Sequence, residues 1–227
     1  MERDYKTTYS KVEATTRVVI LNTQLVLLGD SIIDNKTYVL DGEFSVLEHI
    51  QSKTETPVNQ LALDGATTDD VISNQINEIP FGNSHIVLSV GGNDLLNEIG
   101  FLMEDFKYTP NQVLKRCHSL IAPITQKYES IVSQLQTTSR ANLLLCTVYE
   151  GDLEGSAIYD DIAISSRAML SLFNDSIYKT HNKFRTGVLE LRNIFTEKED
   201  YANPIEPSHQ GGEKLATKLV EWVDATS

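Results

Sequence analysis

The chain has 227 residues, of which 41% are hydrophobic and 22% are charged, and its formal net charge is −13. This length suffices for a domain with a substantial core, and the composition is that of a globular protein. The excess of acidic side chains argues against a nucleic-acid-binding surface, which needs clustered Lys and Arg. No segment predicts a membrane-spanning helix, because no apolar run is long enough.

The start of the chain bears on its location. Residues 1–11 are polar, and the apolar stretch 18–28 is interrupted by polar residues and lacks a small-residue cleavage site. A secretory signal is therefore disfavoured, although a chain whose signal has been trimmed, or one exported by another route, would look the same.

Cys117 and Cys146 have no metal-like spacing. We interpret both as reduced core residues, which favours a cytoplasmic location.

Strand-like and helix-like segments alternate along the chain. In chain order the hydrophobic pattern predicts a strand over 25–28, a helix over 44–51, a strand over 58–63, a helix over 68–79, a strand over 85–90, a helix over 110–135, a strand over 142–148, a helix over 162–182, a strand over 187–191 and a helix over 212–223. Residues 17–21 extend or precede the first strand. Pro123 is expected to kink or divide the predicted helix 110–135.

Five strands joined by helices predict right-handed crossovers and a mainly parallel sheet covered on both faces. We therefore expect an α/β fold with three α/β/α layers of the flavodoxin-like type. No repeat or linker divides the chain, so one domain is predicted over 1–227, with residues 1–16 as a candidate flexible extension.

Small and polar residues follow three of the predicted strands. Gly29-Asp30-Ser31 follows the first, Asp64-Gly65-Ala66-Thr67 the second, and Gly91-Gly92-Asn93-Asp94 the third. The carboxyl ends of parallel strands meet at one edge of a sheet, which is where open α/β proteins bind ligands. The segment Glu206-Pro207-Ser208-His209 precedes the last helix and can reach the same edge.

These segments resemble the motif blocks of the SGNH or GDSL-type serine hydrolases. The family has Gly-Asp-Ser first, then a strand-end Gly, then Gly-x-Asn-Asp, and last an acid three residues before a His. In this chain the blocks occur in that order as Gly29-Asp30-Ser31, Gly65, Gly92-Asn93-Asp94 and Glu206-x-x-His209. The family's usual acid is Asp, so Glu206 is a departure, and Glu197, Glu199 or Asp200 could take its place.

The chemistry of an acyl-serine hydrolase needs these residue types. A serine hydroxyl such as that of Ser31 needs a base to take its proton, and His209 is expected to do so. Three residues of separation can put an acid and a His on one turn, so Glu206 is expected to orient His209. The resemblance implies that the backbone N–H groups of Ser31 and Gly65 and the side-chain amide of Asn93 form the oxyanion hole.

Each motif residue also has a plainer interpretation. Ser31 could cap a helix, and Gly65 and Asn93 could be ordinary turn residues. Asp30 and Asp94 are expected to hold their turns through hydrogen bonds to the backbone. No His or carboxylate pair outside the motif blocks has metal-ligand spacing, so no metal is predicted.

The segment 95–103 is more apolar than one buried helix face requires. Core packing would account for most such stretches. We also hypothesise that Leu96 and Phe101 line an acyl pocket beside the predicted oxyanion donors.

The sequence thus predicts a hydrolase that cleaves an acyl, acetyl or thioester substrate through an acyl-serine intermediate, without metal or cofactor. Its expected partner is a small-molecule ester, and its oligomeric state is left open. Two other classes remain: a nucleotide- or flavin-binding module on the same fold, and a non-catalytic relative. The first lacks a Gly-x-Gly-x-x-Gly or Walker pattern, and the second would not need His209.

Overall fold

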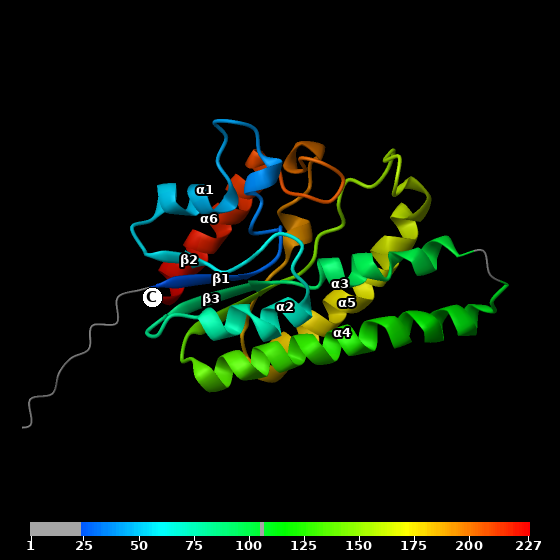
Figure 1. Ribbon diagram of the computed structural model, residues 1–227, viewed down its shortest axis with the longest axis horizontal. Coiled ribbons are helices and arrows are strands. Elements are labelled where there is room, and N and C mark those ends of the chain that lie inside the picture. The colour runs from blue at the N-terminus through cyan, green and yellow to red at the C-terminus, as the bar shows by residue number, and fades with distance from the viewer. Residues whose placement is uncertain (1–23, 105–106) are drawn as a thin grey trace, which may run out of the picture.

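The computed structural model describes residues 24–104 and 107–227 (Figure 1). Its centre is a five-stranded sheet in the order β2-β1-β3-β4-β5, in which every neighbouring pair is parallel. This is the strand order of flavodoxin-like folds, and the predicted five-stranded parallel sheet is confirmed. The strands are β1 (Leu25–Gly29), β2 (Val58–Gln60), β3 (His85–Ser89), β4 (Asn142–Cys146) and β5 (Gly187–Leu189).

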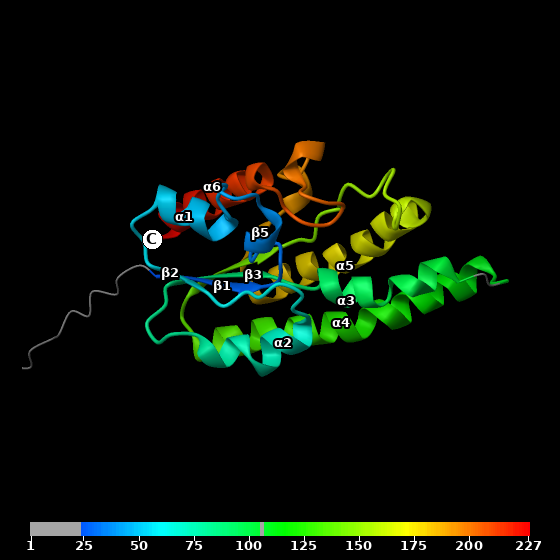
Figure 2. The ribbon, with the colours of Figure 1, turned by 45° about the horizontal axis from the view of Figure 1, so that its top comes forward.

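Helices cover both faces of the sheet (Figure 2). On one face lie α1 (Val46–Lys53) and α6 (His209–Thr226), which pack on each other. The other face carries α2 (Thr68–Ser73), α4 (Pro110–Thr138) and α5 (Ala163–Phe184), and the short α3 (Gly92–Asn97) follows β3. Strands β1 and β3 are buried along their whole length between these layers, which explains their continuous apolar sequences.

Several helices differ from the sequence prediction. Helix α2 ends at Ser73 instead of residue 79, and Gln75–Glu78 form a separate 3₁₀-helix, η2. Helix α4 runs undivided through Pro123, because the neighbouring Ile121 and Ile124 are buried and their packing outweighs one lost backbone hydrogen bond. Helix α6 begins at His209, three residues earlier than predicted, because Ser208 caps it by accepting a hydrogen bond from the N–H of Gly211. The predicted segments 1–16 and 17–21 lie outside the described residues. Within the described ranges, no helix combines the length and apolar character that crossing a membrane requires.

The turn after β1 depends on a glycine. Gly29 has a φ of +132°, and a Cβ atom there would overlap the carbonyl oxygen of Ser89 on β3. The backbone of Gly29 is held by Gln75, whose side chain both accepts from its N–H and donates to its carbonyl at 2.8 Å. The next N–H, that of Asp30, donates to the Ser89 oxygen at 3.1 Å. Strand β1 is thereby locked to β3 at the point where the polar residues begin.

We expect Gly29→Ala to destabilise the fold strongly. The positive φ costs about 1–3 kcal/mol for a residue with a side chain, and the overlap with Ser89 adds about 1–3 kcal/mol of overpacking. Gly42→Ala is the matched control, because Gly42 has a φ of +89° but open space where a Cβ would stand. Urea unfolding should show a clearly larger loss for Gly29→Ala. Equal losses in the two variants would contradict the proposed close approach of β1 to β3.

Candidate active site

The polar residues after β1, β2 and β3 meet at one edge of the sheet. The Asn93 side-chain amide, at the start of α3, donates to the carbonyl of Ala66 at 3.0 Å. The Asp94 carboxylate accepts from the backbone N–H of Thr68 at 2.9 Å and from its hydroxyl at 2.6 Å. These bonds join the segments after β2 and β3. Asp94 therefore holds the neighbouring segment at Thr68, whereas the sequence predicted that it would hold its own turn.

Ser31 lies in the tight turn that follows β1. The N–H groups of Ile33 and Asp34 both donate to the carbonyl of Asp30, at 3.1 and 3.0 Å, and so close the turn around Ser31. The backbone N–H of Ser31 donates to no other residue in the described parts of the chain, and the same is true of Gly65. Both N–H groups are therefore available to a ligand. Asn93 can add the second N–H of its amide, since the first is used by Ala66.

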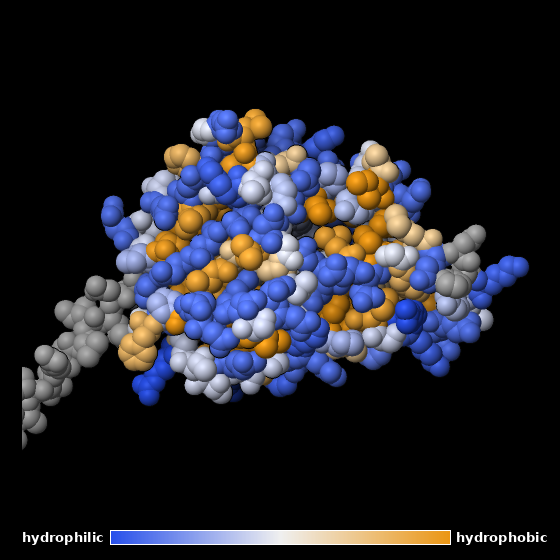
Figure 3. Space-filling model, in the orientation of Figure 1, coloured by the Kyte–Doolittle hydropathy of each residue, from blue (hydrophilic) through white to orange (hydrophobic). Residues whose placement is uncertain are grey.

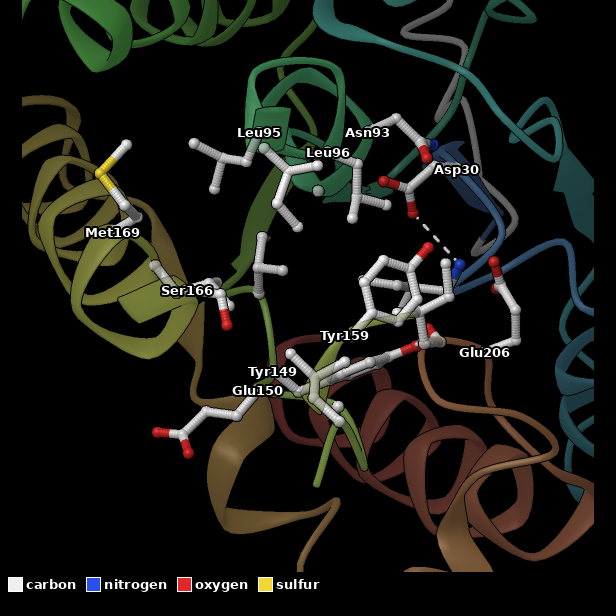
Figure 4. A pocket seen from close by; sticks show the side chains of 18 of the residues that line it. Asp30, Asn93, Leu95, Leu96, Tyr149, Glu150, Tyr159, Ser166, Met169 and Glu206 are labelled. Atoms are coloured by element: carbon white, nitrogen blue, oxygen red, sulfur yellow. Dashed lines mark hydrogen bonds between the residues drawn. The ribbon is translucent and has the colours of Figure 1, made fainter. Parts of the chain in front are cut away.

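A pocket opens beside these donors. It encloses about 830 Å³, part of it open to solvent, and Ser31, Asn93 and Glu206 lie in its wall. Most of the wall is apolar, and in Figure 3 apolar side chains gather around a hollow on this face. Figure 4 shows Met169 on α5 at one end of the pocket and Asp30 and Glu206 at the other. The apolar lining consists of Ile32, Leu95, Leu96, Ile99, Leu102, Val148, Tyr149, Leu153, Tyr159, Met169, Leu170 and Ile205.

The structure places only one of the two predicted acyl-pocket residues in this wall. Leu96 lines the pocket, but Phe101 does not, and the guanidinium of Arg116 lies over its ring at 5.9 Å. Residues Ile99–Met103 form a 3₁₀-helix, η3, in which neighbouring side chains point in directions about a third of a turn apart. Leu102 therefore takes the position expected of Phe101.

Glu206 faces Ser31 from the loop before α6. Its side chain is only 7% exposed, and its Oε2 atom is buried without a hydrogen-bond partner in the described residues. Burial raises the pKa of this carboxyl to about 7; the hydroxyl of Ser31 lowers it, and Asp64 raises it further. The two groups are neighbours rather than a well-formed hydrogen-bonded pair, since no bond of ordinary length and angle joins them.

His209 does not line this pocket, so the structure does not bring it together with Ser31 as the sequence predicted. Its Nδ1 atom accepts from the N–H of Phe44 at 3.0 Å and lies 3.1 Å from Nε2 of His49. The reason is the start of α6: His209 is its first helical residue, whereas Glu206 lies in the non-helical loop before it. Their three-residue spacing is therefore not a helical one, and the two side chains diverge.

None of the three alternative acids, Glu197, Glu199 and Asp200, lines this pocket, and Asp200 is a structural residue. Asp200 is fully buried, and its carboxylate accepts from the N–H groups of Thr196 and Glu197 and from the ammonium group of Lys214. It is absent from the pocket wall. Within the described ranges, no group of three or more His, Cys, Asp or Glu side chains is arranged to hold a metal ion.

The sequence suggested that the acidic loop 149–161 borders the site, but it gave Tyr149 no role of its own; the structure shows that Tyr149 supports the site. It follows β4, its ring lines the pocket, and its hydroxyl donates to the carbonyl of Ile205 at 2.7 Å. The same loop is held by Asn203, whose side-chain oxygen accepts from the N–H groups of Ile205 and Glu206. The only signal in the sequence was the place of Tyr149 just after a buried strand, at the same edge as Ser31.

Asp30 is a second carboxyl with unusual basicity. Burial raises its pKa to about 8; the N–H of Ile32, which donates to its Oδ1 at 3.1 Å, lowers it, and the nearby Glu206 and Asp94 raise it (Figure 4). At neutral pH Asp30 is therefore mainly protonated. The hydrogen bond from Ile32 confirms the expectation that Asp30 holds its own turn.

A model of the family described as GDSL-like Lipase/Acylhydrolase matches residues 25–213. Among curated proteins no sequence matches significantly.

Similar solved structures include three hydrolases. A phospholipase A1 from Streptomyces albidoflavus has a TM-score of 0.65 at 15% identity, over 91% of this chain and 100% of that one. An extracellular lipase from Streptomyces rimosus has a TM-score of 0.65 at 16% identity, over 90% and 100%. The acetylxylan esterase Axe2 from Geobacillus stearothermophilus has a TM-score of 0.60 at 15% identity, over 88% and 94%. At these identities the likeness shows the fold.

We expect stability to fall with rising pH through the titration of Asp30. Its pKa is about 8 in the folded chain against an ordinary 3.8, so between these values the folded state holds a proton that the unfolded state has lost. The free energy of unfolding should then fall with pH, by up to about 1.4 kcal/mol per unit for one such proton. Glu206 contributes in the same direction up to its pKa of about 7.

Asp30→Asn keeps an oxygen for the N–H of Ile32 but cannot titrate. Urea unfolding between pH 5 and pH 8 should therefore show a flatter decline for this variant than for the wild type. The matched variant Glu206→Gln should flatten the decline only below about pH 7. Parallel curves for the wild type and Asp30→Asn would show that Asp30 is already ionised in the folded state.

Proposed function

Because the chain belongs to the GDSL-like lipase/acylhydrolase family and is a carboxylic ester hydrolase, we propose that it cleaves its substrate through an acyl intermediate on Ser31. The observation that carries this proposal is the position of Ser31: its side chain lines an apolar pocket, with free N–H donors at the same edge of the sheet. The comparisons offer no support for a nucleotide- or flavin-binding module.

The proposed reaction has two halves. The oxygen of Ser31 attacks the ester carbonyl carbon, its proton passes to a base, and the carbonyl π electrons move onto the oxygen. When this intermediate collapses, the bond to the alcohol oxygen breaks and the alcohol leaves with the proton. Water then attacks the acyl-serine in the same way and releases the carboxylic acid.

The oxyanion formed in each half needs donors aimed at it. We assign the N–H groups of Ser31 and Gly65 and the free amide N–H of Asn93 to this role. Gly65 itself is not in the pocket wall, but it adjoins Ala66, whose carbonyl holds Asn93. Loss of one such donor commonly costs about 2.7–4 kcal/mol of transition-state stabilisation.

The pocket indicates the class of substrate. Its wall is mainly aliphatic and aromatic. The Asp and Glu side chains that line it are Asp30, Glu98, Glu150 and Glu206, and no Lys or Arg is among the lining residues that the structure describes. An uncharged ester with an apolar acyl or alcohol group fits this surface, whereas a substrate with an anionic group near the ester would be repelled.

We also propose a cytoplasmic location, which is favoured by two buried, unpaired cysteines, Cys117 and Cys146.

We expect Ser31→Ala to abolish ester hydrolysis. Removal of a serine nucleophile should lower kcat by at least about 10⁴-fold, because no acyl intermediate can form. The measurement is turnover of p-nitrophenyl esters together with labelling by a fluorophosphonate probe. Unchanged turnover or labelling in Ser31→Ala would refute the assignment of the nucleophile.

Leu96→Ala should change the preference for acyl-chain length, whereas Phe101→Ala should not. Removing the Leu96 side chain widens the pocket, and one methylene of lost contact is worth about 1–3 kcal/mol in discrimination between substrates. The ratio of kcat/KM values across p-nitrophenyl esters of increasing acyl length is the readout, and it is independent of how much enzyme is folded. A larger change in Phe101→Ala than in Leu96→Ala would mean that acyl chains bind elsewhere.

A further inference from the structure

Building on the proposed acyl-serine reaction, we propose that Glu206, and not His209, is the general base that takes the proton of Ser31. The site then works with a serine and a glutamate, without an imidazole. This assignment reverses the roles expected from the sequence, in which Glu206 was to orient His209.

The first argument is the position of the carboxyl. Glu206 and Ser31 line the same pocket, and the Ser31 hydroxyl is close enough to influence the titration of Glu206. Oε2 of Glu206 is buried without a hydrogen-bond partner in the described residues. A buried carboxylate oxygen that lacks a donor is costly to maintain, so a structural role alone does not explain it. The Ser31 hydroxyl, which already influences the titration of Glu206, is the donor that we assign to it.

The second argument is that His209 is engaged elsewhere. The N–H of Phe44 donates to its Nδ1, and the imidazole of His49 lies against its ring with 4.6 Å between the ring centroids. No histidine lines the pocket, as far as the described residues show. Its other carboxyls are less suited: Asp30 is mainly protonated at neutral pH, Glu98 lies in the turn between α3 and η3, and Glu150 lies in the loop after β4.

The third argument is the chemistry that the surroundings allow. An exposed carboxylate is a poor base for a hydroxyl, but burial raises the pKa of Glu206 to about 7, close to that of a free imidazole. The ionisable groups near it are Asp30, Asp64, Tyr38 and Tyr149. They are acids or phenols, so none of these described groups stabilises the carboxylate by charge.

The proton balance of the step is complete. As the bond between Oγ of Ser31 and the carbonyl carbon forms, the hydroxyl proton moves to an oxygen of Glu206, and the carbonyl π pair moves to the oxyanion. The neutral carboxylic acid then returns this proton to the alcohol oxygen as the bond to carbon breaks. In the second half Glu206 takes a proton from water and returns it to Ser31.

Two variants separate the candidates. Glu206→Gln keeps the size of the side chain but cannot accept a proton, so kcat/KM for p-nitrophenyl esters should fall by about 10²–10⁴-fold, the usual contribution of general-base catalysis. His209→Gln should stay within a few-fold of the wild type. Glu206→Asp and Glu206→His, which retain a titratable group, should recover part of the loss in Glu206→Gln.

The pH dependence of kcat/KM distinguishes a general base from a residue that has only a structural role. Wild-type kcat/KM should fall below about pH 7, His209→Gln should keep this fall, and the residual activity of Glu206→Gln should lose it. Circular dichroism and urea unfolding establish that each variant is folded.

The outcomes distinguish the base from the nucleophile. Full activity in Glu206→Gln, or a loss in His209→Gln as large as in Ser31→Ala, would overturn the assignment of Glu206 while leaving the acyl-serine reaction intact. A wild type that neither turns over esters nor reacts with fluorophosphonate would instead overturn the proposed function itself.

Discussion

The close approach of β1 to β3 at Gly29 is the constraint on which the site depends. Only a residue without a side chain can stand against the Ser89 carbonyl with a φ of +132°. This contact ends β1 abruptly and directs the chain into the turn that carries Ser31. The same strand pair aligns the loop after β3, from which Asn93 reaches across to Ala66. The proposed nucleophile, Ser31, and the proposed oxyanion donor Asn93 are thus positioned by the backbone of the sheet.

Burial of carboxyl groups is the second organising feature. Asp30 and Glu206 are both removed from water and face other acidic groups, so each holds its proton more strongly than an exposed acid does. This arrangement lowers the free energy of unfolding as the pH rises. Carboxyl groups whose pKa is strongly raised are typical of catalytic sites, where the reaction makes use of the shift.

Much of this architecture could be predicted from residue order. The alternation of short apolar runs with amphipathic segments predicted the five-stranded parallel sheet, because the pattern depends on local periodicity. Gly29-Asp30-Ser31 and Gly92-Asn93-Asp94 were recognisable as strand ends for the same reason. The boundaries of α6 were less predictable, since they depend on the cap supplied by Ser208. Because α6 begins three residues earlier than predicted, His209 lies in the first turn of the helix and not at the expected site.

The last motif shows where spacing misleads. Glu206 and His209 are three residues apart, and this spacing alone does not say which of the two side chains lines the pocket. The loop between Tyr201 and Pro207 decides it, through the hydrogen bonds of Asn203 to the backbone of Glu206 and of Tyr149 to Ile205. The sequence by itself determined the fold, the family and the place of Ser31, because these follow from local patterns. Only the tertiary structure decided which side chain faces Ser31, because that depends on contacts between segments far apart in the chain.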